Sequence, residues 1–364
     1  MKKALIITNH RKDRSPGQRF RFEQYLNFLQ HNGYEINFSN LLSENDDKVF
    51  YEKGRYASKF WVIVKTFWKR CLLFFSIYKY DVIFIFREAY FTKTIFFETW
   101  YKKLSNAKFI FDFDDSIWID TISEGNKKFA WLKDASKTSK LIALCNLIFA
   151  GNEYLADYAR KYNKQVIIVP TTIDTQEYTL KNYNQAYSNK ICIGWSGSFS
   201  TIQHFCFAIP ALLILKEKYG ANIFFKVIGD KNFEHQLLGI KGMAWNKEDE
   251  IKELQSFDIG IMPLPDDEWT KGKCGLKGLQ YMALGIPTIM SSVGVNKDII
   301  DDGVNGFLAS NTEEWVEKIS LLIESTPLRK KIGNAGRLTV EERYSTLANQ
   351  SLYLKAFNDL IKHS

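Results

Sequence analysis

Short apolar runs alternate with segments of helical periodicity through the first half of the chain. Residues 3–8 are apolar and precede a polar loop, and the segment from Phe20 to Leu29 has the spacing of a helix that stops before Gly33. Four further apolar runs follow, at residues 82–86, 109–113, 142–150 and 166–169. Strands that alternate with helices form mostly parallel sheets with crossover helices. The first half is therefore predicted to be a Rossmann-like lobe.

A second series of the same kind begins after the polar segment 174–189, which is the predicted linker. Its apolar runs are residues 191–195, 223–228, 259–262 and 288–290. Near the end of the chain, Asn311 precedes Glu314 by three residues and Thr326 precedes Pro327, and both patterns mark the start of a helix. We therefore predict an α/β protein of two doubly wound Rossmann-like lobes, with an interdomain cleft at the carboxyl ends of the strands.

Composition narrows the class of protein. The 364 residues are 46% hydrophobic and 25% charged, which excludes a disordered or fibrous chain and suits two domains. The apolar run after Lys3 is shorter than the core of a signal peptide, and the five cysteines show no C-x-x-C spacing. We therefore expect a cytoplasmic protein without a disulfide framework or a zinc site.

The net charge of +8 is concentrated in the first third of the chain, where residues 1–110 carry 20 Lys and Arg against 10 Asp and Glu. Residues 59–80 are aromatic and aliphatic, with basic residues among them and no acidic one. These charges exclude a membrane span, because each costs about 2.5–3.5 kcal/mol at the bilayer centre. Two interpretations stay open: a helix on an anionic membrane surface, and a buried amphipathic helix whose lysines reach solvent. Nucleic acid is not an expected partner, since no recognition motif accompanies the charge.

The segment before the apolar run at 286–290 has the features of an anion site. Residues 271–278 read Lys-Gly-Lys-Cys-Gly-Leu-Lys-Gly, and a helical pattern follows. The backbone N–H groups of Cys274, Gly275 and Leu276 are expected at the helix N-terminus, where the helix dipole favours an anion. Lys273 and Lys277 add charge that suits a diphosphate. The alternative is a solvated basic turn that caps an ordinary helix.

This segment resembles the donor-binding motif of family 4 glycosyltransferases, which are retaining enzymes of the GT-B fold that use nucleotide sugars. Gly229-Asp230, Pro170–Asp174 and the segment 298–308 are similar to landmarks of that family in the same order. The resemblance covers nearly the whole chain and is strongest over residues 258–308. It implies three parts: an acceptor-binding lobe at residues 1–180, a nucleotide-sugar-binding lobe at 185–340, and a last helix at 341–364 that packs back on the first lobe.

In that family the helix begins near a Glu that faces the donor sugar, and a second Glu eight residues later holds the ribose hydroxyls. These positions fall on Gly272 and Gln280 here, so the resemblance implies that Gln280 binds the ribose as a neutral partner. The family also places an Arg and a Lys in the loop after the first strand of the second lobe. This chain has Gly197 and Ser198 there and no cation. We therefore expect Lys273 and Lys277 to neutralise the diphosphate, with Ser198 and nearby backbone amides as hydrogen-bond donors.

The resemblance also assigns residues at the base and in the first lobe. Trp245 and Asn246 lie where the family contacts the base, although Trp245 fits a core position equally well. Gly17 lies in the loop after the first strand, where the family has a glycine-containing loop facing the diphosphate and the acceptor. Arg19 and Arg21 follow it and are candidates to grip a phosphate. A purely structural role for them is disfavoured, because cations at a helix N-terminus oppose its dipole.

Three carboxylates occur near the end of the strand predicted at 109–113, namely Asp112, Asp114 and Asp115. Acids so close together repel one another and need a reason. By position Asp114 matches a His of the family's active site, so Asp114 and Asp115 are the candidate catalytic residues that orient the acceptor hydroxyl or accept its proton. The alternatives are a D-x-D metal site, as in GT-A glycosyltransferases, and a structural helix cap.

Together these features predict a retaining, metal-independent glycosyltransferase of the hexosyltransferase type. It is expected to need no cofactor and to move a sugar from a nucleotide sugar to a glycan or lipid-linked acceptor, in cell-surface polysaccharide assembly at the inner face of a membrane. A GT-B nucleotide-sugar epimerase is one alternative. A non-catalytic scaffold with a degenerate donor motif is the other.

Overall fold

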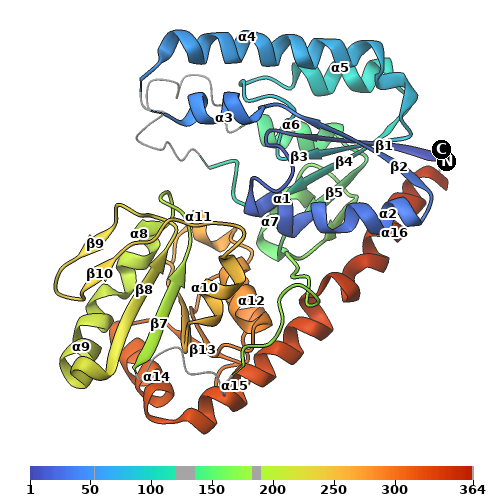
Figure 1. Cartoon of the computed structure of the whole chain (residues 1–364). Coiled ribbons are helices and arrows are strands. Elements are labelled where there is room, and N and C mark those ends of the chain that lie inside the picture. The colour runs from blue at the N-terminus through green and yellow to red at the C-terminus, as the bar shows by residue number, and fades with distance from the viewer. Residues whose placement is uncertain (53, 120–135, 183–189, 363–364) are drawn as a thin grey trace. The chain divides into compact units, whose positions relative to one another are not determined.

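The chain divides into two units, each built on its own parallel sheet flanked by helices (Figure 1). The computed structural model describes residues 1–52, 54–119, 136–182 and 190–362. Unit 1 consists of Met1–Thr171 together with the chain from Asn349 onward, and unit 2 of Thr172–Ala348. Within the described residues, no helix is both long enough and apolar enough to cross a membrane. The predicted α/β architecture of two Rossmann-like lobes is confirmed.

Unit 1 contains a parallel sheet in the order β2-β1-β3-β4-β5-β6. Its strands are β1 (Lys2–Thr8), β2 (Tyr34–Asn40), β3 (Val82–Phe86), β4 (Lys108–Phe113), β5 (Leu147–Ala150) and β6 (Val166–Ile168). The central strand β3 is buried along its whole length, as expected for a strand covered by helices on both faces. The direction of strand order reverses between β1 and β3, and such switch points are where α/β sheets bind ligands.

The helices of unit 1 follow the strands in sequence. They are α1 (Pro16–Arg21), α2 (Leu26–His31), α3 (Glu44–Tyr51), α4 (Tyr56–Leu72), α5 (Phe96–Leu104), α6 (Ser136–Leu144), α7 (Glu153–Arg160) and most of α16 (Thr346–Lys362). The single helix expected from Phe20 to Leu29 is instead α1, a 3-10 turn at Glu23–Tyr25, and α2. The break occurs because Phe22 has a non-helical backbone (φ −136°, ψ −27°).

The apolar run 142–150 is also divided, since it contains the end of α6 and all of β5. Asn146 lies between the two elements, and its Oδ1 accepts a hydrogen bond from the Phe109 N–H of the neighbouring strand (2.9 Å). A buried helix end and a buried strand have the same apolar composition, so the run alone does not separate them.

The last helix, α16, contributes to the core of unit 1. The Tyr353 ring stacks on Tyr25 with 4.1 Å between centroids, and its hydroxyl donates to the Arg21 carbonyl. Phe357 packs edge-on against Tyr34 at 5.5 Å. These contacts close the core cluster that also includes Phe22, Phe84 and Phe149.

Unit 2 contains a parallel sheet in the order β13-β12-β11-β7-β8 and a small antiparallel hairpin. Its strands are β7 (Ile191–Ser196), β8 (Ile223–Ile228), β9 (Glu234–His235), β10 (Ile240–Lys241), β11 (Ile259–Met262), β12 (Thr288–Ser291) and β13 (Phe307–Ala309). Its helices are α8 (Ile202–Phe205), α9 (Ile209–Tyr219), α10 (Glu250–Gln255), α11 (Glu268–Lys271), α12 (Leu276–Ala283), α13 (Asn296–Ile299), α14 (Thr312–Glu324) and α15 (Thr326–Thr339).

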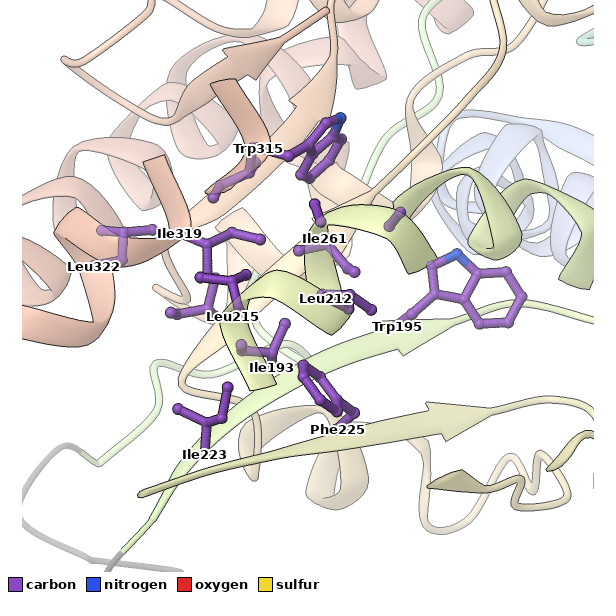
Figure 2. Close-up of a cluster of buried hydrophobic side chains, with 14 of the residues drawn as sticks. Ile193, Trp195, Leu212, Leu215, Ile223, Phe225, Ile261, Trp315, Ile319 and Leu322 are labelled. Carbon is purple, nitrogen blue, oxygen red and sulfur yellow. The ribbon is translucent and has the colours of Figure 1, made fainter. Parts of the chain in front are cut away.

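The core of unit 2 lies between one face of this sheet and the helices α9 and α14 (Figure 2). Ile193 of β7 and Leu212 of α9 are almost completely buried there, together with Ile319 of α14. Trp195, near the end of β7, is 1% exposed. This packing fixes the carboxyl end of β7, where the loop with Gly197 begins.

The described part of the predicted linker belongs to unit 2. Tyr178 is fully buried, and the Lys181 ammonium donates to the Phe257 carbonyl (2.5 Å) and to Asp258 Oδ1 (2.8 Å). The polar, non-periodic sequence therefore correctly indicated a loop, but this loop packs against unit 2 and is not a free linker. Residues 183–189 of the predicted linker lie outside the described residues.

Candidate functional site

The candidate donor site of unit 2 centres on the start of α12. Gly275 precedes the helix in the left-handed conformation (φ +71°), and a Cβ there would lie 2.3 Å from Ile299 Cδ1. The first hydrogen bond of the helix runs from the Leu279 N–H to the Gly275 carbonyl (3.0 Å). The N–H groups of Leu276 and the next two residues thus have no acceptor within the helix. An anion placed before this turn would face those amides and the positive end of the helix dipole.

Lys273 and Lys277 are half-buried, and both lie over aromatic rings. Lys277 Nζ is 5.5 Å from the centroid of the Trp195 ring, and Lys273 Nζ is 5.0 Å from that of Trp269. Lys277 is in the first turn of α12, and Trp195 is near the end of β7. The contact with the Trp195 ring therefore places the Lys277 ammonium beside the end of that strand. Cys274, between the lysines in sequence, is buried, and its Sγ faces the Gly272 carbonyl at 3.8 Å.

The loop after β7 and the loop after β8 approach each other so closely that a side chain at Gly197 or Gly229 would clash. A Cβ on Gly197 would lie 2.2 Å from the Trp195 indole, and a Cβ on Gly229 would lie 2.1 Å from the Gly197 carbonyl oxygen. Gly229 also has φ +120°, which glycine adopts without strain. The two glycines therefore permit a backbone crossing directly next to the ring that carries Lys277.

Ser198 is an expected hydrogen-bond donor, and its backbone amide already has an acceptor in the protein. Its N–H donates to Thr201 Oγ1 (2.9 Å) within the same loop. The Ser198 hydroxyl lies 2.9 Å from the Ser200 hydroxyl, and both can rotate toward a ligand. The hydroxyl, rather than the amide, is thus the group of Ser198 suited to bind a phosphate.

Tyr281 fixes α12 against β7. Its hydroxyl accepts a hydrogen bond from the Ser196 N–H (2.8 Å), and burial raises the pKa of this phenol. A Cβ on Gly260 of β11 would lie 2.5 Å from the Tyr281 ring, so the glycine makes room for it. This anchor sets the position of Lys277, one helical turn earlier.

Gln280 lies in a buried hydrogen-bond network. Its Nε2 donates to the Tyr178 hydroxyl (2.9 Å) and to Glu250 Oε1 (3.3 Å), and the Tyr178 hydroxyl donates to Glu250 Oε2 (3.0 Å). Trp245 Nε1 donates to Glu250 Oε1 (2.9 Å), which links the predicted base-binding segment to Gln280. Asn246 is exposed and donates to Asp249 Oδ2 at 3.1 Å. Sequence reasoning missed Tyr178 and Glu250, because neither belongs to a local motif.

At the carboxyl edge of the sheet in unit 1, Arg87 joins Asp114 and Asp115. Its Nε is 2.8 Å from Asp114 Oδ1, and its Nη2 is 2.5 Å from Asp115 Oδ2. A Cβ on Gly17 would lie 2.8 Å from Asp114 Oδ2, so the glycine loop lies against the same carboxylates. The guanidinium explains how the two acids tolerate each other. Within the residues that the structure describes, no three His, Cys, Asp or Glu side chains are grouped to hold a metal ion.

Arg87 and Glu88 were also missed by sequence reasoning. They directly follow β3, and a charged pair at the end of a buried strand is a signal that could have identified them. Glu88 accepts from Asn9 Nδ2 (3.1 Å) and from the Lys137 ammonium (2.8 Å). The ends of β1 and β3 therefore contribute to the same polar edge as Asp114.

Arg21 is structural, which corrects its assignment to acceptor binding. Its side chain is fully buried, pairs with Asp112, and donates to the Val169 carbonyl. Burial raises the pKa of Asp112 to about 6, although the guanidinium acts in the opposite direction. Arg21 lies at the end of α1 rather than at its start, so its charge favours the helix dipole instead of opposing it. Arg19 is also buried, 4.9 Å from the Phe20 ring.

Comparison with known proteins agrees with this architecture. Residues 190–325 match the family described as Glycosyl transferases group 1. A crystal structure of a glycosyltransferase from Rickettsia africae superimposes with a TM-score of 0.70 at 17% identity, covering 100% of this chain and 99% of the other. The chain has the GT-B fold. Anabaena HepE, crystallised with UDP and glucose, has the same fold, with a TM-score of 0.66, 13% identity, and coverage of 98% and 99%.

The sequence match to a curated protein is shorter. Spore coat protein SA of Bacillus subtilis is 32% identical over 68 residues, which are 18% of this chain and 18% of that protein. The family match thus covers most of unit 2 of the GT-B fold, where the glycine loops, the start of α12 and the Gln280 network occur.

Proposed function

We propose that the protein is a retaining glycosyltransferase that moves a sugar from a nucleotide sugar to a hydroxyl of a glycan or lipid-linked acceptor. The observation that carries the donor half is the start of α12, with Lys277 held over Trp195 beside the Gly197 loop. This arrangement supplies helix amides, an ammonium and a hydroxyl to one anion. A nucleoside diphosphate leaving group suits that set of donors.

The proposed mechanism places the catalytic effect on the leaving group. Donors that stabilise the departing diphosphate let the sugar develop oxocarbenium character, and the acceptor hydroxyl attacks from the same face. In this proposal the transfer needs no metal ion, because the amides and lysines stabilise the charge of the leaving diphosphate. Hexosyl transfer and membership of family 4 are parts of the same proposal, supported by the motif at residues 271–278.

Donor binding is the first test of this proposal. Thermal unfolding is measured with UDP, GDP, CMP, dTDP and their common sugar conjugates, starting with UDP because it is the nucleotide bound to HepE. A ligand at 100 times its Kd stabilises the native state by about 2.7 kcal/mol. A shift with one nucleotide class supports the proposal and identifies the donor class. The absence of any shift contradicts it.

The acceptor half is assigned to the polar edge of unit 1. We propose that Asp114 or Asp115 orients the acceptor hydroxyl, with Arg87 holding both carboxylates in place. Asp114→Asn and Asp115→Asn are then expected to lower turnover while leaving the donor Kd unchanged. Equal loss of donor binding in these variants would instead assign the carboxylates a structural role.

A non-catalytic binding protein is a second candidate. It is favoured by Gly272, which occupies the position of the family's sugar-facing Glu and ends α11 rather than lying in α12. Nucleotide binding without transfer to any glycan or lipid-linked acceptor would support that alternative. Turnover of a nucleotide sugar without acceptor would support an epimerase.

For its setting, we propose cell-surface polysaccharide assembly at the cytoplasmic face of a membrane. Support comes from the basic and aromatic segment 59–80, whose helix α4 carries exposed tryptophans. Co-sedimentation with anionic vesicles tests this setting separately from donor binding.

A further inference from the structure

The outward face of α4 is more apolar than its inward face. Trp61, Trp68 and Leu72 follow one another at seven and four residues, which places them on one side of the helix, and they are 68%, 63% and 66% exposed. The opposite side carries Thr66 and Arg70, which are both fully buried. A helix on the surface of a water-soluble protein usually has its apolar face buried and its polar face exposed. The exposed aromatic face of α4 therefore indicates a partner.

The polar side of α4 has a structural purpose, which is to hold the segment after β3. Arg70 Nε donates to the Ala89 carbonyl (2.6 Å), and the Tyr90 hydroxyl donates to the Ile63 carbonyl (2.8 Å). The Lys137 ammonium donates to the Thr92 carbonyl (2.9 Å). The wall formed by residues 89–92 is therefore held in place by buried and part-buried hydrogen bonds.

This wall, α4 and α5 line a cavity of about 610 Å³ that is open to the surface, and its volume is within the range of roughly 300–1,000 Å³ that is usual for small-ligand sites. Most of its lining is apolar: Phe67, Tyr90, Ile95, Phe96, Phe97 and Trp100. Phe67 and Phe97 join the two helices at 5.3 Å between ring centroids, and the helices run along the same side of unit 1 (Figure 1). Its remaining lining residues are threonines. Such a cavity suits a hydrocarbon chain and offers no charge to bind a polar ligand.

Basic residues outnumber acidic ones in the two segments that carry the aromatic face and line the cavity. Lys79 lies over the Tyr78 ring at 5.8 Å, and Lys103 lies over the Trp100 ring at 5.3 Å. Residues 54–80 contain no acid, and the acid in the segment 89–111, Glu98, is fully buried. Lysines beside exposed aromatic rings match the headgroup region of an anionic bilayer, where Trp and Tyr are also enriched.

We propose that the aromatic face of α4 docks on an anionic bilayer and that the cavity between α4 and α5 takes up one hydrocarbon chain of an anionic lipid. The cavity wall begins directly after Glu88, so the cavity and the polar edge with Arg87 share one segment of chain. A chain held in the cavity would keep its lipid attached to the unit that carries Asp114 and Asp115. The identity of this lipid as the sugar acceptor rests on the proposed function, whereas chain binding itself does not.

Docking is tested with the full chain and vesicles of phosphatidylcholine, with and without phosphatidylglycerol. We expect co-sedimentation with the anionic vesicles, and a loss of at least about tenfold in partitioning for the double variant Trp61→Ser/Trp68→Ser. Phe207→Ser, which removes an exposed aromatic ring from unit 2 (56% exposed), is the matched control and is expected to bind as the wild type does. A wild-type protein that stays in the supernatant, or a double variant that binds equally well, overturns the docking step.

Chain uptake is tested with dodecyl phosphate below its micelle concentration, and propyl phosphate provides the same headgroup without the chain. We expect binding of dodecyl phosphate alone, weakened at least about tenfold by Thr94→Trp, which places an indole in the cavity. Asn106→Trp adds the same ring at an exposed site that does not line the cavity and is expected to change nothing. Equal binding by Thr94→Trp and the wild type overturns the cavity assignment, as does equal binding of both phosphates.

These measurements use no nucleotide, so they separate the two proposals. Loss of lipid binding with nucleotide binding intact refutes the lipid site alone. Lipid binding that persists without any nucleotide-induced shift refutes the proposed transferase and leaves the lipid site standing.

Discussion

Lys277→Ala gives the sharpest prediction for the donor site. The ammonium lies 5.5 Å from the centroid of the Trp195 ring and one turn before Tyr281, which anchors α12 to β7. Without ligand, removal of the ammonium gives up a cation–π contact of about 0.5–1 kcal/mol. With a diphosphate bound, it gives up a charged hydrogen bond of about 1.5–3 kcal/mol. Because about 1.4 kcal/mol corresponds to a tenfold change, nucleotide Kd is expected to rise between about tenfold and 150-fold.

The assay is titration of the stabilising nucleotide by calorimetry, with unliganded thermal unfolding recorded for each variant. Lys277→Arg keeps the positive charge and is expected to recover part of the affinity, since a longer, planar group fits the ring differently. Lys252→Ala removes an exposed lysine from α10 of the same unit and serves as the control. Added salt should weaken nucleotide binding by the wild type, and it should weaken binding by Lys277→Ala to a smaller extent.

One result would refute the reasoning about this lysine. If Lys277→Ala folds normally and binds the nucleotide with the wild-type Kd, the ammonium does not contact the diphosphate. The anion would then be held by the amides of the first turn of α12 together with the remaining donors, Lys273 and the Ser198 hydroxyl.

Three further substitutions probe the parts that support the site. Arg21→Met leaves the Asp112 carboxylate buried without its cation, and denaturant unfolding should report a loss of about 3–5 kcal/mol in the free energy of unfolding. Arg160→Met, which removes the exposed arginine that ends α7, is the control and should leave stability essentially unchanged. Gly229→Ala forces a Cβ to within 2.1 Å of a backbone oxygen and should abolish nucleotide binding before it unfolds unit 2, which calorimetry and circular dichroism can distinguish. Gln280→Glu brings a second carboxylate to Glu250 and should lower stability by about 2–4 kcal/mol without improving nucleotide affinity; a gain in affinity would contradict this.

The sequence pattern predicted the sheets better than the helices. Strands such as β8 and β11 are preceded by a polar residue and followed by a glycine or a proline, and they were predicted at their observed limits. The run 142–150 was wrongly interpreted as one element. It contains the end of a helix and a whole strand, and Asn146 is the polar residue between them. The break at Phe22 was also missed, since its aromatic side chain packs in the core of unit 1 and satisfies the helical spacing.

Local motifs supplied the candidate donor residues, whereas partners distant in sequence could not be predicted. Lys277 and Gly275 were predicted because glycines and lysines before a helix have a direct physical meaning. Tyr178 is 102 residues from Gln280, and Arg87 is 27 residues from Asp114. Arg21 was misassigned for the same reason, as its partner Asp112 is 91 residues away.

The network around Gln280 explains why a neutral residue stands where the resemblance implies a glutamate. Glu250 already brings a carboxylate to that place from α10, and it accepts hydrogen bonds from Gln280, Tyr178 and Trp245. A second buried carboxylate within 3.3 Å would repel the first, and its oxygens could not donate as the amide does. The amide satisfies Glu250 with its NH₂ group, and the described residues provide no hydrogen bond to its Oε1. That oxygen can therefore accept a hydrogen bond from a ligand hydroxyl, which is what the proposed ribose contact requires, while the negative charge of the network stays on Glu250.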